Sequence, residues 1–105
     1  GGTVLWPGSH VLVRQKLLEH PNGIPHDELN QWCLNEALDR VRSGTLLLGS
    51  ETAHSATQQG TDNCETLEQV TGKAGDIVLM HPWLIHAGTT NLRSVVRLMG
   101  NGMAR

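Results

Sequence analysis

The chain has 105 residues, enough for one small domain with a modest core. Its net charge is -2 without a run of like charge, which gives no electrostatic case for nucleic acid or an anionic membrane, and no apolar run approaches the ~20 residues of a membrane span. Cys33 and Cys64 form neither a CxxC pair nor a disulfide framework. We therefore expect two reduced thiols in a cytoplasmic protein.

The first half of the chain predicts a strand followed by two helices. Residues 3–6 are β-branched or apolar and run into a Pro-Gly turn, as a strand does. Ser9 is placed to cap a helix over residues 11–18, and Asp27 to cap a longer second helix. The second helix has an apolar stripe at Leu34, Ala37, Leu38 and Val41, with Glu36 and Arg40 spaced to pair on its other side.

The second half of the chain predicts β-structure. A short apolar run precedes a polar segment over residues 49–63, which is expected to be a loop. Several short strands joined by turns favour an antiparallel sheet, sandwich or barrel. The strands are expected at residues 45–48, 66–70, 76–81, 83–87 and 94–103.

The beginning of the chain indicates its domain organisation. A strand starts almost immediately after Gly1-Gly2, without a leading polar segment. We therefore expect residues 1–105 to be the C-terminal portion of a single domain that is truncated at its N-terminus.

His86 and Arg97 flank the polar turn near the end of the chain. A hairpin centred between residues 91 and 92 would place them directly opposite each other on one sheet face, with Cβ atoms ~5 Å apart. The arginine would then project into an apolar interior, where it needs a carboxylate partner.

Two interpretations of this arrangement remain open on spacing alone. In the first, His86 is a metal ligand beside an Arg97 that binds an acidic cosubstrate. In the second, His86 is a buried histidine with a backbone partner, and Arg97 forms an ion pair with Asp76.

Three landmarks occur in order along the chain: "GGTVLWPGSH", then "GDIVLMHPWLIHAGTTN", then an arginine eleven residues after the last histidine. Together they resemble the phytanoyl-CoA dioxygenase family of Fe(II)- and 2-oxoglutarate-dependent oxygenases. The resemblance implies an α+β chain with a partial double-stranded β-helix (jelly roll), in which two helices follow the first strand. It also implies iron held by an HxD pair and a distant histidine, which His86 matches, and 2-oxoglutarate held by Arg97.

The chain departs from the family pattern at the other metal ligands. The HxD pair would fall upstream of Gly1, while the sequence His26-Asp27-Glu28 lies on the wrong side of the PGSH box. Gly88 stands where the family often has a hydroxyl residue that helps to hold 2-oxoglutarate. We expect the full-length parent to be the enzyme, and this portion alone to bind iron weakly and to be inactive.

Other functions remain open for the same scaffold. They are a non-catalytic jelly-roll binding module, a halogenase-like variant of the family, and a unit that only folds or dimerises. The expected partners are a small-molecule substrate and molecular oxygen, with neither nucleic acid nor a membrane. The identity of the primary substrate and the oligomeric state cannot be predicted.

The remaining histidines and tryptophans are expected to be mainly structural. His81 differs in parity from His86 and should end a strand rather than bind the same metal. His10 follows the PGS turn, as part of the turn or at a pocket rim. Trp6 and Trp83 are expected in the core, with the lining of a substrate pocket as the alternative, and Asn91 in the hairpin turn.

Overall fold

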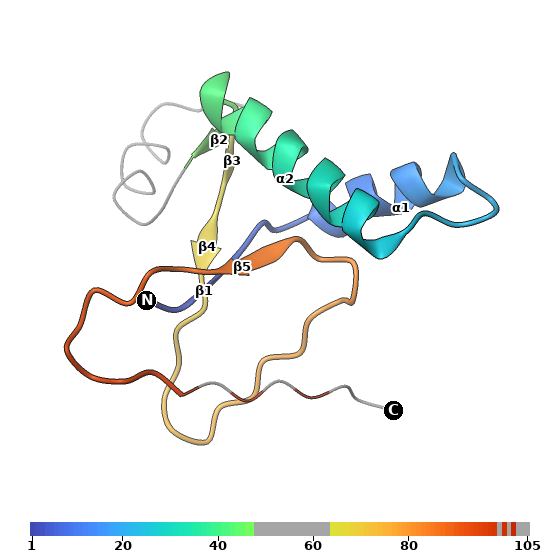
Figure 1. Cartoon of the computed structure of the whole chain (residues 1–105). Helices are drawn as coiled ribbons and strands as arrows, with labels where there is room; N and C mark the ends of the chain where they lie inside the picture. The colour runs from blue at the N-terminus through green and yellow to red at the C-terminus, as the bar shows by residue number, and fades with distance from the viewer. Residues whose placement is uncertain (48–63, 99, 101, 103–105) are drawn as a thin grey trace.

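The protein is described by a computed structural model for residues 1–47, 64–98, 100 and 102 (Figure 1). Helices and short strands are mixed, which confirms the predicted α+β class, and two helices follow the first strand as expected. A complete jelly roll is not seen in this part of the chain. The elements in chain order are β1 (Thr3–Leu5), α1 (Ser9–Leu18), α2 (His26–Arg42), β2 (Leu46–Leu47), β3 (Glu65–Thr66), β4 (Glu68–Gln69) and β5 (His86–Gly88).

Both helices form where the sequence predicts them, but their N-terminal caps differ from the prediction. Gly8 precedes α1 with φ of 82°, a left-handed conformation that suits glycine, and Ser9 is the first helical residue. Pro25 precedes α2, so Asp27 lies in the first turn of the helix. A negative charge there interacts favourably with the helix dipole. No helix of the described residues is long and apolar enough to span a membrane.

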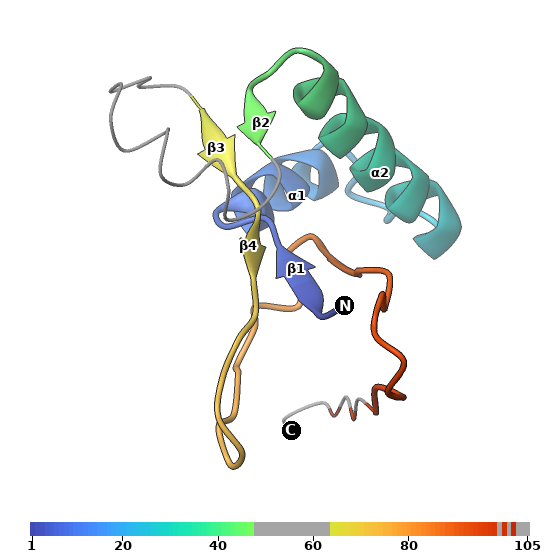
Figure 2. The same ribbon diagram turned by 90° about the vertical axis from the view of Figure 1, so that its left-hand side faces the viewer.

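The strands form two small sheets. In the first, β1 lies between β4 and β5 and is antiparallel to both, with Leu5 opposite His86 and Val4 opposite Gln69. In the second, β2 and β3 are parallel. Figures 1 and 2 both show α1 and α2 on one side of the three-stranded sheet. This sheet brings the PGSH end of β1 next to the strand that carries His86.

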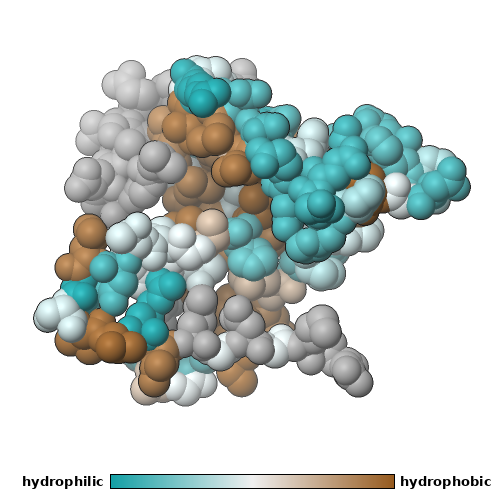
Figure 3. Space-filling view, in the orientation of Figure 1, coloured by the Kyte–Doolittle hydropathy of each residue, from teal (hydrophilic) through white to brown (hydrophobic). Residues whose placement is uncertain are grey.

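Two predicted strands are not found. Residues 76–81 and 94–98 have no strand partner among the described residues, although they are rich in apolar side chains. A strand is stabilised by its ladder, and without one the apolar side chains stay in solvent: Ile77 is 84% exposed and Val96 is 81% exposed. Figure 3 shows apolar surface, in brown, in the region after β5. The predicted loop over residues 49–63, and several positions after residue 98, lie outside the described residues.

The buried core is small and centres on Trp6. Its side chain is 1% exposed, as predicted, and Val13 and Leu46 are the other buried apolar residues of the described part of the chain. The expected stripe on α2 is only partly covered, since Leu34 is 53% exposed. Trp83 is 41% exposed, so its predicted core position was wrong.

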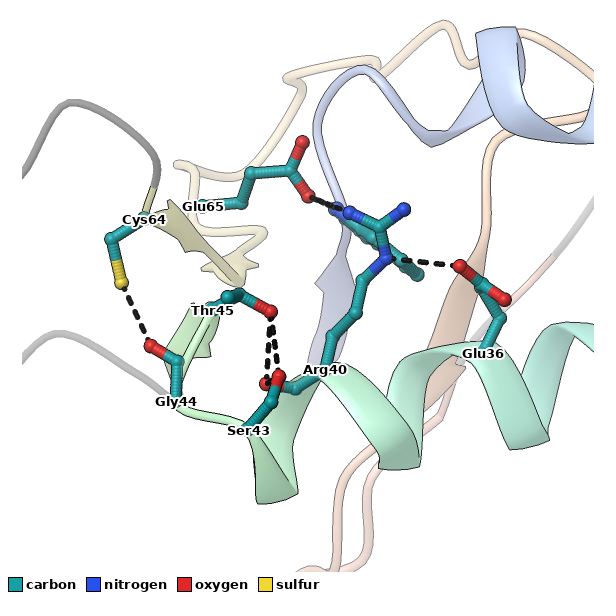
Figure 4. A network of polar contacts seen from close by, with 8 residues as sticks. Glu36, Arg40, Ser43, Gly44, Thr45, Cys64 and Glu65 are labelled. Atoms are coloured by element: carbon teal, nitrogen blue, oxygen red, sulfur yellow. Dashed lines mark hydrogen bonds and ion pairs between the residues drawn. The ribbon is translucent and has the colours of Figure 1, made fainter.

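Charged side chains of α2 and β3 form a network that also contacts Trp6, the residue after β1. Figure 4 shows its Glu36, Arg40 and Glu65 members. The indole Nε1–H of Trp6 donates to Oε2 of Glu65 at 2.7 Å. Arg40 binds Glu36 at 3.1 Å, as its spacing predicts, and reaches Glu65 at 3.5 Å. The Arg40 guanidinium also lies 5.2 Å from the centroid of the Trp6 ring, within the range of a cation–π contact. These contacts hold the end of β1 against α2.

Candidate active site

His86 is the first residue of β5, and its imidazole is oriented by its own backbone. Nδ1 lies 2.8 Å from the carbonyl oxygen of Leu84. A carbonyl oxygen can only accept, so Nδ1 is the protonated nitrogen in this contact. The neutral ring then has its lone pair on Nε2. A neutral histidine in this tautomer can bind a metal through Nε2.

The faces of the small sheet separate two groups of side chains. Side chains alternate along a strand, so Val4, Trp6 and Ala87 lie on one face, and Leu5 and His86 on the other. The contact between Trp6 and Arg40 identifies the first face as the one toward α2. His86 therefore belongs to the face that the helices do not cover.

Arg97 lies on the same face as His86. A Cβ atom built on Gly88 would extend from the face that carries His86, and it would be 3.5 Å from Nη2 of Arg97. Nη1 of Arg97 lies 3.5 Å from the carbonyl oxygen of Thr89, which is at the limit of a hydrogen bond. The guanidinium is therefore beside the C-terminal end of β5, next to the histidine strand.

The predicted hairpin between His86 and Arg97 is not observed. The strand partner of His86 is Leu5, and residues 94–98 form no strand. The turn itself is present: Asn91 donates to the carbonyl of Val95 at 2.8 Å and accepts the Arg93 N–H at 3.2 Å. The two residues thus share a face without being cross-strand neighbours.

The alternative ion pair between Arg97 and Asp76 is also not observed. Oδ2 of Asp76 accepts the backbone N–H of Lys73 at 2.7 Å and closes a local turn. Within the described part of the chain, Arg97 has no carboxylate within 4.0 Å. The guanidinium therefore keeps donors for an acidic ligand.

The residues present fit one ligand position of an iron site and do not complete it. No group of three His, Cys, Asp or Glu side chains that could hold a metal occurs among the described residues. The sequence His26-Asp27-Glu28 is in the first turn of α2. His26 there lies 3.3 Å from the Asn30 amide, a contact within the helix.

His81 and His10 form a separate pair at the PGSH box. Their ring centroids are 5.2 Å apart, and Nδ1 of His81 accepts the backbone N–H of Trp83 at 3.1 Å. His81 does not end a strand as predicted, because residues 76–81 form none; it begins the turn that leads to β5. His10 is the second residue of α1 rather than part of a loop.

Sequence reasoning missed the part played by Ser9. Its side chain is 0% exposed, and its Oγ accepts the backbone N–H of Ile85 at 2.8 Å, so it does not cap α1. Thr89 is bonded in a similar way, to the backbone of Gly2. The only sequence signal for Ser9 is its place in the PGSH box.

An apolar cavity of about 620 Å³ lies between helix α2 and the two paired strands β1 and β5. Its volume is in the range of small-molecule pockets, and apolar side chains dominate its lining. Cys33 and Asn30 contribute polar groups from α2, and the cavity extends to His86 at the edge of the sheet.

On a mixed α+β scaffold, the site brings together an imidazole whose Nε2 lone pair is free and a guanidinium that has no carboxylate partner among the described residues. A family-level comparison agrees with it: the phytanoyl-CoA dioxygenase (PhyH) family model matches residues 1–99. The chain therefore belongs to the phytanoyl-CoA dioxygenase family, whose members typically use Fe(II) and 2-oxoglutarate. No curated protein and no solved structure matches the chain.

Proposed function

We propose that this chain supplies the distant histidine ligand and the 2-oxoglutarate-binding arginine of an Fe(II)- and 2-oxoglutarate-dependent dioxygenase of the hydroxylase type. The observation that carries the proposal is the geometry of His86. Its Nδ1–H is held by the Leu84 carbonyl, which leaves the Nε2 lone pair for a metal, and Arg97 stands on the same sheet face.

In this proposal Arg97 binds the remote carboxylate of 2-oxoglutarate. A guanidinium can donate two parallel hydrogen bonds to a carboxylate. The absence of a carboxylate partner for Arg97 among the described residues supports this part. When bound, Fe(II) and 2-oxoglutarate supply the oxidation chemistry, and the chain contributes geometry and exclusion of water.

We also propose that the HxD pair lies upstream of Gly1, in a longer protein of which residues 1–105 are the C-terminal portion. The described residues provide only one of the three ligands of a facial triad. Exposed apolar side chains such as Leu79 (86% exposed) and Leu98 (92% exposed) support the same idea, because further strands would cover them. This portion alone is then expected to bind iron weakly and to be inactive.

The test measures succinate formation from 2-oxoglutarate with Fe(II) and oxygen, using the full-length gene product. Wild type is compared with Arg97→Ala and with Arg14→Ala, a matched control in which an exposed arginine of α1 is removed. We expect Arg97→Ala to raise the KM for 2-oxoglutarate strongly and Arg14→Ala to leave it unchanged. Equal activity in wild type and Arg97→Ala, or no succinate with a broad substrate panel, would contradict the proposal.

The apolar cavity beneath α2 favours a second candidate, a binding module that kept the scaffold without the metal. The codons upstream of Gly1 separate the candidates. An HxD pair there supports the dioxygenase, and its absence supports the binding module. An HxG or HxA sequence instead indicates a halogenase-like member, with halide in place of the carboxylate.

A further inference from the structure

We infer that Ser9 is a positioning residue for His86, which it orients through the peptide unit between Leu84 and Ile85. The inference rests on the proposed function only in treating His86 as a metal ligand. The geometry itself comes from contacts between the PGSH box and the residues just before β5.

The first step is the end of the β1–β5 ladder. The backbone N–H of Trp6 donates to the carbonyl of Ile85 at 2.9 Å, which continues the register of the strands by one pair. In an antiparallel ladder such a pair exchanges two hydrogen bonds, so the Ile85 N–H would ordinarily donate to the Trp6 carbonyl. Here the Trp6 carbonyl accepts the Ser9 N–H at 3.2 Å instead.

The second step is the hydroxyl that replaces this acceptor. Ser9 Oγ accepts the Ile85 N–H at 2.8 Å, and the Ser9 side chain is fully buried. This hydrogen bond is partly buried, and a backbone N–H that loses its partner in such a position is unfavourable. The hydroxyl therefore determines how the chain enters β5.

The third step connects this bond to the imidazole. The Ile85 N–H and the Leu84 carbonyl belong to one planar peptide unit. That carbonyl accepts Nδ1–H of His86 at 2.8 Å. The hydrogen bonds therefore run from the His86 ring through the peptide to Ser9, and fixing one side of the peptide plane fixes the acceptor on the other. Outer-shell partners of this kind set the tautomer and direction of metal-binding histidines.

Thr89 holds the other end of the same ladder. Its Oγ1 accepts the Gly2 N–H at 2.6 Å and donates to the Gly2 carbonyl at 2.8 Å. Its carbonyl oxygen faces Arg97 rather than His86. Removal of the Ser9 hydroxyl should therefore disturb His86 and leave Arg97 in place.

The experiment compares the full-length wild type with Ser9→Ala, using Ser43→Ala as a matched control. The Ser43 hydroxyl is exposed and bonds the carbonyl of Arg40 at the end of α2, away from the site. Amide hydrogen exchange and imidazole 15N NMR of the metal-free protein are measured first. In Ser9→Ala we expect at least about tenfold faster exchange of the Ile85 amide and a shift of His86 from the Nδ1–H tautomer toward a mixture. The Ala87 amide, which lies within the ladder, should change little.

Fe(II) affinity and steady-state kinetics then follow. We expect Ser9→Ala to weaken Fe(II) binding about 10- to 100-fold, with the KM for 2-oxoglutarate nearly unchanged. Unchanged Ile85 exchange and an unchanged His86 tautomer in Ser9→Ala would overturn the inference, whatever the activity. A predominant Nε2–H tautomer in the wild type would also overturn it, without any need for the variant to fold. If instead His86→Ala retains full Fe(II) affinity and turnover, the proposed function fails while the link between Ser9 and the His86 ring still stands.

Discussion

The Arg97 guanidinium lies 3.5 Å from the carbonyl oxygen of Thr89, three residues beyond His86 and on the same face of the sheet. At this distance the contact is weak and uses little of the donor capacity of the side chain. The two groups that the proposal needs are thus brought together from one stretch of chain. The position of the His86 imidazole and that of the Arg97 guanidinium do not depend on a direct contact between the two groups.

Gly88 lies between these two groups, and its lack of a side chain can be tested. A Cβ atom there would be 3.5 Å from Nη2 of Arg97, an ordinary van der Waals distance, and Gly88 does not have a positive φ. Gly88→Ser and Gly88→Ala should therefore both fold. We expect Gly88→Ser to lower the KM for 2-oxoglutarate a few-fold, because its hydroxyl adds a polar contact beside Arg97, and Gly88→Ala to leave it unchanged. Steady-state kinetics and thermal unfolding check this, and equal KM values for the two variants would contradict it.

The helices could be predicted from sequence because their hydrogen bonds are local. The stretch from His26 to Arg42 contains its own i,i+4 bonds and its Glu36–Arg40 pair, so a short window of sequence is sufficient. A short window of sequence is not sufficient in the same way for the strands expected at 76–81 and 94–98. Their apolar pattern is typical of strands, but a strand also needs a partner, which the described residues do not provide.

The candidate site shows the same division between local and distant signals. Residue type and spacing single out His86 and Arg97, and the family resemblance gives them their expected roles. Their predicted register is wrong because it assumes that β5 pairs with the segment that follows it. The sequence predicts a helix cap at Ser9 because that role is local. Its actual partner, Ile85, is 76 residues away in the sequence, and no periodicity connects the two.

The two leading glycines differ in how much space surrounds them. A Cβ atom on Gly1 would lie 2.6 Å from the backbone oxygen of Thr90, whereas one on Gly2 would meet the end of the flexible Gln69 side chain at 3.0 Å. In the full-length protein we expect Gly1→Ala to destabilise the fold by about 1–3 kcal/mol, since backbone must move, and Gly2→Ala to cost clearly less. Urea unfolding measures both. A Gly2→Ala variant that is as destabilised as Gly1→Ala would show that the close approach of Thr90 is not what requires glycine.

The Trp6 side chain is part of the buried core and also contacts the charged network of Glu36, Arg40 and Glu65. Trp6→Phe keeps an aromatic ring but removes the Nε1–H that donates to Glu65. Hydrogen bonds to charged groups contribute about 1.5–3 kcal/mol, so we expect a loss of about 2 kcal/mol in the free energy of unfolding. The matched control is Trp83→Phe at a half-exposed position, with an expected change of about 0.5 kcal/mol or less. Similar losses for the two variants would argue against a special role for the Trp6–Glu65 bond.

Cys33 gives the protein a predictable dependence on alkaline pH. Partial burial of its side chain on α2 raises the pKa of the Cys33 thiol above the ordinary value of 9.0, and a backbone hydrogen bond only partly opposes this. The folded protein therefore holds the thiol proton more tightly than the unfolded chain does. Its contribution to stability is fully present below about pH 9, falls as the pH rises above that value, and levels off above the folded-state pKa. We expect the free energy of unfolding to fall less steeply from pH 8.5 to pH 10.5 in Cys33→Ser than in wild type. Parallel pH profiles for the two proteins, with Cys64→Ser as the matched control, would show that Cys33 is not the group responsible.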